Sequence, residues 1–402
     1  MTIHGPHQRD AALDHALALL ENVPLVDGHN DLPWTIRTSR LARGDVIAYD
    51  LTRVHERADT DIPRLKEGRV SAQIWAAFIP SKTQQPARAA LELIDVILRI
   101  EEAHPDVFLP ARRSSDIERA KRAGKIASII GIEGGVGLEN SLSPLRVWHA
   151  AGARLMTLCH NETLDWIDSA TDEKRHGGLT AFGRAVVREL NRLGMFVDCA
   201  HVSHDVMRQV LDISAAPIVM SHSNAFALCD HPRNVPDDVL ARLKANGGLV
   251  MATFVPDFIS RATRNWDRPL RDTHGKAPEG LNVEKAAAER AQAVGPRPPA
   301  TLQQLADHIL YLADKAGIDH IGIGSDFFGG PTPVGLEDVS RFPFLLAELI
   351  RRGWSDDSIA KIAGGNFVRA FRAVERASKS LREERPLVGR IDEFADSRAS
   401  PA

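Results

Sequence analysis

Short apolar stretches recur along the chain, and segments with the residue spacing of amphipathic helices separate them. Eight of these stretches are rich in β-branched and other apolar residues, which is typical of strands buried on both faces of a parallel sheet. They cover residues 24–31, 70–80, 125–135, 154–162, 196–203, 217–224, 248–256 and 320–330. Apolar residues at helical spacing predict helices between them, at residues 88–103, 180–193, 205–211, 237–244 and 302–316.

Eight repeats of strand and helix predict an α/β fold of the (β/α)8 TIM-barrel type rather than an open sheet. The 402 residues are sufficient, because such barrels need roughly 250 residues and more when they carry insertions. We expect a single catalytic domain over residues 1–386. A long, partly helical excursion over the barrel mouth is expected at about residues 257–300, and a weakly ordered tail at residues 387–402.

The composition narrows the class of protein. The chain is 44% hydrophobic and 26% charged, as in folded globular proteins. A net charge of −3 and the absence of a basic patch in the sequence argue against nucleic acid as a partner. No run of 18 apolar residues predicts a membrane span, and the first residues, rich in acids and histidines, do not predict a signal peptide. Cys159, Cys199 and Cys229 lack a CxxC spacing, so we expect reduced core residues in a cytoplasmic protein.

Polar side chains able to bind metal follow six of the eight predicted strands. The carboxyl ends of all barrel strands open onto one face, where active sites lie, so these side chains should converge on one cleft. Imidazole nitrogen and carboxylate oxygen are ligands that suit Zn²⁺. The pattern therefore predicts a metal-dependent hydrolase. In chain order, the residues are His29, Asp31, Glu133, His160, His201, His222 and Asp326.

Each of these residues also has a structural interpretation. Asp326 could cap a helix, and Glu133 could be a buried acid paired with an arginine. A single histidine at the end of a buried strand could be a hydrogen-bonded core residue. His204 is expected to be a surface or capping residue, and the glycines after Glu133 would let a ligand approach the backbone. The sequence contains neither a GxSxG elbow nor a GxxxxGK[ST] phosphate loop.

Longer segments of the chain resemble the renal (membrane) dipeptidase family of zinc peptidases, over residues 23–374. The segments that carry the resemblance include VDGHNDLPW at 26–34, GIEGG at 131–135, TLCHNE at 157–162 and GLTAFGRAVVRELNRLGMFVDCAHVS at 178–203. The others are SHSNA at 221–225, RNVPDD at 233–238, GSDFFG at 324–329 and GLEDVSRFP at 335–343. The resemblance implies a barrel with a site for two divalent metal ions, most commonly Zn²⁺, in a bacterial-type member of the family.

The resemblance also implies the metal ligands. His29 and Asp31 would bind one zinc ion, and His201 and His222 would bind the other. Glu133 would bridge both ions.

Three further residues would act on the substrate. His160 would contact the substrate carbonyl and stabilise the oxyanion, and Arg233 would grip the terminal carboxylate with its planar guanidinium. Asp326 would bind substrate and transfer the proton. The implied reaction is hydrolysis of the amide bond of free dipeptides, including those with a C-terminal D-residue, by attack of a hydroxide that bridges the metals.

Two alternatives and two departures accompany this resemblance. The chain could be a related barrel amidohydrolase acting on another amide, a lactam or an N-acyl amino acid, or a metal-binding protein without activity. Arg233 distinguishes a dipeptidase from the related amidohydrolase, because a dipeptidase needs a free carboxylate on its substrate. Phe328 stands where the family often has Asp, and Val255 where the mammalian enzyme has Tyr, so we expect an altered pocket. A homodimer is implied by analogy with the family.

Overall fold

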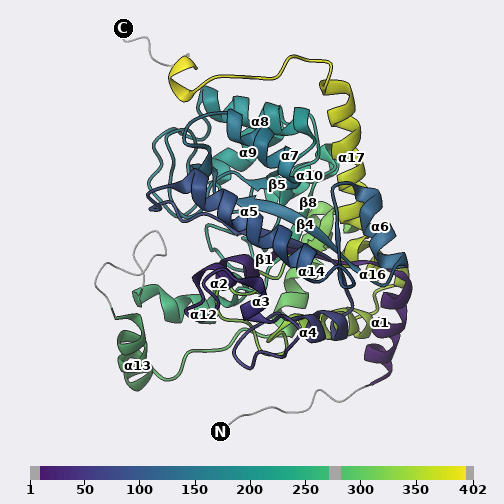
Figure 1. Cartoon of the computed structure of the whole chain (residues 1–402). Helices are drawn as coiled ribbons and strands as arrows, with labels where there is room; N and C mark the ends of the chain where they lie inside the picture. The colour runs from purple at the N-terminus through teal and green to yellow at the C-terminus, as the bar shows by residue number, and fades with distance from the viewer. Residues whose placement is uncertain (1–9, 271–281, 395–402) are drawn as a thin grey trace.

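The computed structural model describes residues 10–270 and 282–394 (Figure 1). Eight parallel strands pair in a closed ring, because β2 bonds to both β1 and β4 and the far edge returns to β1 through β9. The predicted (β/α)8 barrel is therefore confirmed, and each strand overlaps one predicted stretch. The strands are β1 (Leu25–Asn30), β2 (Val70–Phe78), β4 (Ile126–Glu133), β5 (Ala153–Thr157), β6 (Phe196–Asp198), β7 (Val219–Met220), β8 (Leu249–Ala252) and β9 (Ile321–Ile323).

One further strand, β3 (Phe108–Pro110), lies outside the ring and was not predicted. It pairs in parallel with the start of β4, where Phe108 lies opposite Ile126. Three residues, of which only the first is buried, give too short a pattern to separate a strand from a loop.

Helices cover the outside of the barrel (Figure 1). The five predicted helices are confirmed as α5 (Pro86–Ala103), α8 (Ala181–Leu193), α9 (His204–Ile213), α10 (Asp237–Asn246) and α14 (Leu302–Ala316). The long C-terminal helix α17, yellow in Figure 1, packs along α8 and α6. The remaining helices are α1 (Ala11–Asn22), α2 (Leu32–Thr38), α3 (Val46–Tyr49), α4 (Ile62–Glu67), α6 (Ser114–Arg122), α7 (Ser143–Ala151), α11 (Pro256–Ile259), α12 (Arg261–Asp267), α13 (Val283–Val294), α15 (Phe342–Arg351), α16 (Asp356–Ala360) and α17 (Asn366–Leu381).

The boundaries of α14 follow from its sequence. The Thr301 hydroxyl accepts from the backbone N–H of Gln304, and the Gln304 side chain accepts from the Thr301 N–H, which satisfies two free donors of the first turn. The helix ends at Gly317, whose φ of +89° suits glycine. Leu305 and Ile309, at helical spacing, are fully buried on the face that packs against β8 and β9.

Strand alternation turns Glu133 into the barrel. Side chains two residues apart point to the same face of a strand, and Gly131 faces Ile74 and Leu155 of the two neighbouring strands. Glu133 is the next residue on this inward face and the last residue of β4. An acidic side chain therefore stands inside the barrel at its carboxyl end.

The connection between β8 and β9 contains the predicted excursion. Its described part holds α11, α12 and α13, and residues 271–281 lie outside the described residues. Its placement over the mouth and the single domain at 1–386 stay predictions. Of the predicted tail at 387–402, residues 395–402 lie outside the described part. No described helix combines the length and the apolar character that crossing a membrane requires.

Two interior glycines let three strand ends approach closely. A Cβ on Gly324 would lie 1.8 Å from the Ser221 carbonyl oxygen, and one on Gly28 would lie 2.5 Å from the same atom. Both distances are far below van der Waals contact, and the obstructing atom belongs to the backbone. β1 and β9 can therefore pack against the end of β7 only without a side chain at these positions.

Replacing Gly324 by alanine should consequently destabilise the fold. The Gly324→Ala substitution forces backbone shifts that cost about 1–3 kcal/mol or more of unfolding free energy. Urea denaturation followed by circular dichroism measures it. Gly330→Ala is the matched control, because a Cβ there meets no heavy atom within 4 Å. Equal stabilities of the two variants would contradict this account of the barrel packing.

Candidate active site

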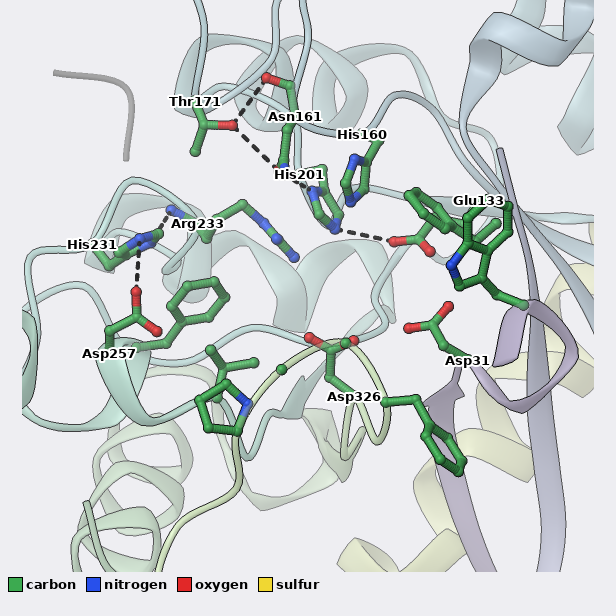
Figure 2. Close-up of a pocket in the computed structure, with 18 residues that line it drawn as sticks. Asp31, Glu133, His160, Asn161, Thr171, His201, His231, Arg233, Asp257 and Asp326 are labelled. Carbon is green, nitrogen blue, oxygen red and sulfur yellow. Dashed lines mark hydrogen bonds and ion pairs between the residues drawn. The ribbon is translucent and has the colours of Figure 1, made fainter. Parts of the chain in front are cut away.

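A cavity of about 380 Å³ opens at the carboxyl ends of the strands. Six of the residues predicted from the sequence line it, and Figure 2 shows them directed toward the same space. His29 and His222 are not among the lining residues, because both are buried beneath the cavity. The lining residues among the predicted set are Asp31, Glu133, His160, His201, Arg233 and Asp326.

One half of the site is centred on His29. Its Nε2 atom lies 3.2 Å from Glu133 Oε2, 3.5 Å from Asp31 Oδ2 and 3.8 Å from Asp326 Oδ1. His29 Nε2 and Asp31 Oδ1 are buried and make no hydrogen bond of good geometry, although carboxylate oxygens lie around His29 Nε2. Because unpaired buried polar atoms are costly, these two atoms fit a bound cation better than an empty protein interior.

The other half of the site contains two histidines from neighbouring strand ends. Glu133 Oε1 lies 3.1 Å from His201 Nε2 and 3.7 Å from His222 Nε2, and the two Nε2 atoms are 2.9 Å apart. Glu133 thus presents one oxygen to each half. Both triads, His29 with Asp31 and Glu133 and Glu133 with His201 and His222, bring one ligand atom from each member within 4.8 Å of one another.

The hydrogen bonds of the two histidines favour lone pairs on both Nε2 atoms. His201 Nδ1 lies 3.1 Å from Asn161 Oδ1, an acceptor, so Nδ1 carries the hydrogen. His222 Nδ1 lies 2.7 Å from the Ser221 hydroxyl, whose own hydrogen is directed elsewhere. Two imidazole lone pairs and a carboxylate oxygen then face one another, an arrangement that a divalent cation would stabilise.

Burial and charge set the protonation of the site. Burial, reinforced by the charge of Arg233, lowers the pKa of His201 well below its usual range and that of His160 to about 3. Burial also lowers the pKa of His29, but the carboxylates of Glu133 and Asp31 outweigh it, so the net shift is upward. Burial, aided by nearby carboxylates, raises the pKa of Asp326 to about 8. The site therefore combines neutral imidazoles with a carboxyl group that can hold a proton.

Arg233 projects into the cavity from the loop after β7. Its guanidinium lies 5.2 Å from the centroid of the Phe258 ring, which shields one face from water. Nη2 donates to the His222 carbonyl oxygen at 3.3 Å, whereas Nε is buried without a partner. The His231 ring stacks on the Phe258 ring, with their centroids 4.1 Å apart. A buried guanidinium with a free donor is suited to binding an anion.

Three residues of the site adopt the left-handed backbone conformation. The φ angles are +68° for His201, +66° for Asp326 and +68° for Phe328. Such angles cost a non-glycine residue on the order of 1 kcal/mol or more and cluster at functional sites. Two backbone hydrogen bonds join the segment of Asp326 and Phe328 to the end of β1, from the Asp326 N–H to His29 O and from the Asp31 N–H to Phe327 O.

The structural interpretations of Asp326 and Glu133 are wrong. No helix begins at Asp326, and the side-chain partners of Glu133 are histidines. His204 is the first residue of α9 and lies outside the cavity, and its Nε2 contacts the Asn234 carbonyl oxygen. The glycines after Glu133 pack against protein backbone, since a Cβ on Gly135 would lie 2.1 Å from Leu158 O. They allow close packing of the chain and do not face a ligand.

Other site residues escaped the sequence analysis. Trp34, Phe78 and Phe258 form apolar parts of the cavity wall, and Asn161 orients His201. Asn161 directly follows His160, and Trp34 lies one helical turn after Asp31, so proximity to a candidate could have flagged both. Phe258 carries no comparable signal, because its role depends on a contact with the distant Arg233.

The two departures from the family pattern both lie in the cavity wall. Phe328 and Val255 line the cavity together with Pro331 and Gly330. Both side chains are partly exposed. The positions expected to alter the pocket are therefore in place to contact a substrate.

A barrel whose mouth gathers three buried histidines and three carboxylates beside a buried arginine has the fold and site of a metal-dependent hydrolase. A model of the membrane dipeptidase family (peptidase family M19) matches residues 13–385. The chain belongs to this family of metallopeptidases, and its reaction class is that of a dipeptidase.

Individual relatives agree with this assignment. The chain is 37% identical to dipeptidase verJ of Clonostachys rogersoniana over 93% of its own length and 90% of that protein. It is 38% identical to dipeptidase 3 of Rattus norvegicus, over 92% of its length and 69% of the relative. Among solved structures, the probable dipeptidase PvdM from Pseudomonas aeruginosa superposes with a TM-score of 0.77 at 29% identity, covering 91% of this chain and 99% of that one.

His308 of α14 ties together two segments that carry the site. Its Nδ1 accepts from the Ala225 backbone N–H at 3.1 Å, and its Nε2 donates to the Ile259 carbonyl oxygen at 2.9 Å. Ala225 begins the loop that leads to Arg233, and Ile259 follows Phe258. The ring must be neutral to serve as both acceptor and donor, and burial lowers its pKa to about 4.

This neutral histidine predicts a loss of stability in acid. Between pH ~6.5 and about 4 the unfolded chain binds a proton at His308 that the folded chain does not. The free energy of unfolding therefore falls as the pH drops through this window, and it recovers as the pH rises. His308→Gln should make this slope shallower in urea titrations between pH 4.5 and 7.5. An unchanged slope would show that His308 does not stay neutral in the fold.

Proposed function

We propose that the chain is a zinc-dependent dipeptidase that hydrolyses the amide bond of free dipeptides. The observation that carries the proposal is a cluster of candidate cation ligands and a buried guanidinium at the same cavity. A dipeptide offers a carboxylate for the guanidinium and, one residue away, an amide carbonyl for the metals. We extend the proposal to dipeptides with a C-terminal D-residue on the basis of the family resemblance. A homodimer and a cytoplasmic location stay predictions.

The residues divide between two ions. His29 and Asp31 would hold one, His201 and His222 the other, and Glu133 both, because its two oxygens face opposite halves of the cluster. Nitrogen and carboxylate donors of this kind suit Zn²⁺. When bound, a pair of such ions polarises a carbonyl and lowers the pKa of water toward about 7, which supplies hydroxide at neutral pH.

Arg233 would orient the substrate. Its planar fork can bind a carboxylate with two parallel hydrogen bonds, and the partnerless Nε and the covering Phe258 ring favour an anion at this point. A carboxylate held there places the scissile amide toward the metal cluster. Internal bonds of long peptides would be poor substrates, because no free carboxylate lies one residue away from them.

His160 and Asp326 would manage charge and protons. His160 is neutral at pH 7, because burial and Arg233 hold its pKa near 3, and a neutral imidazole can donate an N–H to the oxygen that becomes negative. Bound cations would favour the ionised form of Asp326, which would accept the proton of the attacking water and deliver it to the leaving amine. Asp326 then takes up one proton and releases one in each turnover, so that it returns to its starting state.

Asp326→Asn tests the proton transfer. The variant keeps the size of the side chain but cannot carry the proton, so kcat should fall by about 100-fold or more. Bound zinc, measured by atomic absorption after dialysis, should stay at the wild-type level. The assay is release of free amino acids from L-Ala–L-Ala and L-Ala–D-Ala by zinc-loaded protein, with chelator and metal add-back controls. Wild-type turnover in the variant would remove Asp326 from the mechanism.

Arg233→Ala tests the identity of the substrate. Loss of the guanidinium should raise KM for dipeptides by about 10- to 100-fold, the range for a hydrogen bond to a charged group, and hardly change kinetics for a C-terminally amidated dipeptide. Arg233→Lys should recover only part of the affinity, because lysine lacks the planar fork. An equal effect on acid and amide would favour the alternative, an amidohydrolase whose substrate has no free carboxylate.

A further inference from the structure

Three neighbouring strand ends, of β5, β6 and β7, carry a buried hydroxyl–carboxylate–hydroxyl group beneath the cavity. Asp198 Oδ2 accepts from the hydroxyls of Thr157 and Ser221, both at 2.6 Å. Asp198 Oδ1 accepts from the backbone N–H groups of Ser221, at 2.9 Å, and Ala200, at 3.0 Å. The three side chains are 0% exposed, and none of them lines the cavity. Asp198 therefore cannot touch a substrate.

The directions of these hydrogen bonds are fixed by chemistry. Backbone N–H groups can only donate, so the Oδ1 position requires an acceptor. A serine hydroxyl has a single hydrogen, and Ser221 directs it to Asp198 Oδ2. The Ser221 oxygen can then only accept in its second bond, from His222 Nδ1 at 2.7 Å.

This chain determines which nitrogen of His222 carries the hydrogen. With Nδ1–H donating to Ser221, the Nε2 atom keeps its lone pair, and Nε2 is the atom that faces His201 Nε2 and Glu133 Oε1. We propose that Asp198 is a positioning residue that, through Ser221, fixes the metal-binding tautomer of His222. The inference rests on the proposed metal-binding function and assigns a residue outside the ligand set.

The two histidines of this half differ in their supports. His201 Nδ1 is held by the neutral amide oxygen of Asn161 in the cavity wall, whereas His222 is held, through a hydroxyl, by a carboxylate in the interior. A carboxylate behind a metal-ligating histidine raises its basicity and fixes its ring. His222 should therefore depend more strongly on its support than a ligand oriented by an amide.

The hydrogen bonds from His222 through Ser221 to Asp198 form a relay, and Asp198→Asn should reverse its direction. The amide oxygen must occupy the Oδ1 position, because two backbone N–H groups point there, so the amide NH₂ faces the two hydroxyls. Ser221 then accepts from Asn and turns its hydrogen toward His222 Nδ1. The hydrogen of the imidazole moves to Nε2, and the lone pair needed by the metal is lost.

Two variants separate positioning from simple bracing of the strands. Ser221→Ala removes the link to His222 but leaves Asp198 in place, so the tautomer is no longer imposed and the effect should be intermediate. Thr157→Val is the matched control, because it removes the other hydroxyl from the same Oδ2 atom without touching His222. Thermal melting checks that all three variants are folded.

The experiment measures zinc affinity and the His222 tautomer separately. Competition with a chromogenic chelator should show two bound ions in the wild type. One of them should be weakened about 10- to 100-fold in Asp198→Asn, less in Ser221→Ala and less than about two-fold in Thr157→Val. Imidazole ¹⁵N spectra of zinc-stripped protein should show the Nδ1–H form of His222 in the wild type and the Nε2–H form in Asp198→Asn.

Three results would decide against parts of this account in distinguishable ways. Wild-type zinc affinity and tautomer in Asp198→Asn would overturn the relay, and so would equal losses in Ser221→Ala and Thr157→Val. If Asp198→Asn fails to fold, that second comparison still decides. A wild type that shows the Nδ1–H tautomer but binds no zinc would leave the relay standing and overturn the proposed function instead.

Discussion

The structure depends on how buried negative charge is compensated at the barrel mouth. Carboxylate oxygens of Asp31, Glu133 and Asp326 all lie within 4 Å of His29 Nε2. The three acids repel one another, and His29 and Arg233 alone cannot offset three carboxylate charges. Divalent cations can, and the neutral histidines on the other side of Glu133 would offer lone pairs to the same ions. The negative charge of the three carboxylates is thus what favours divalent cations at this site.

The barrel supplies the convergence that this cluster requires. Its side chains come from strand ends as far apart in sequence as β1 and β9, and parallel closure brings those ends to one face. Close packing constrains the backbone locally: His201 and Asp326 have left-handed φ angles, and a Cβ on Gly28 or Gly324 would clash with the Ser221 carbonyl oxygen. Arg233 then completes the site from the loop after β7, with its guanidinium linked to the backbone of His222.

The sequence predicted the features that depend on local patterns. Apolar runs located all barrel strands. Polar residues at their ends located the cluster, because a closed parallel barrel brings all carboxyl ends of its strands to one face. Features that depend on contacts between distant segments were not predictable. Asp198 looked like part of a strand, the glycines after Glu133 looked open to ligand, and Phe258 had no visible tie to Arg233. Three-residue β3 was too short to produce a pattern.

Anomalous X-ray diffraction from crystals grown with zinc tests the central claim most directly. Data collected at the zinc absorption edge locate each ion independently of the protein model. The account predicts two peaks of comparable height, one among His29, Asp31 and Glu133 and one among Glu133, His201 and His222. A single peak, or zinc bound away from Glu133, would contradict the charge-compensation account.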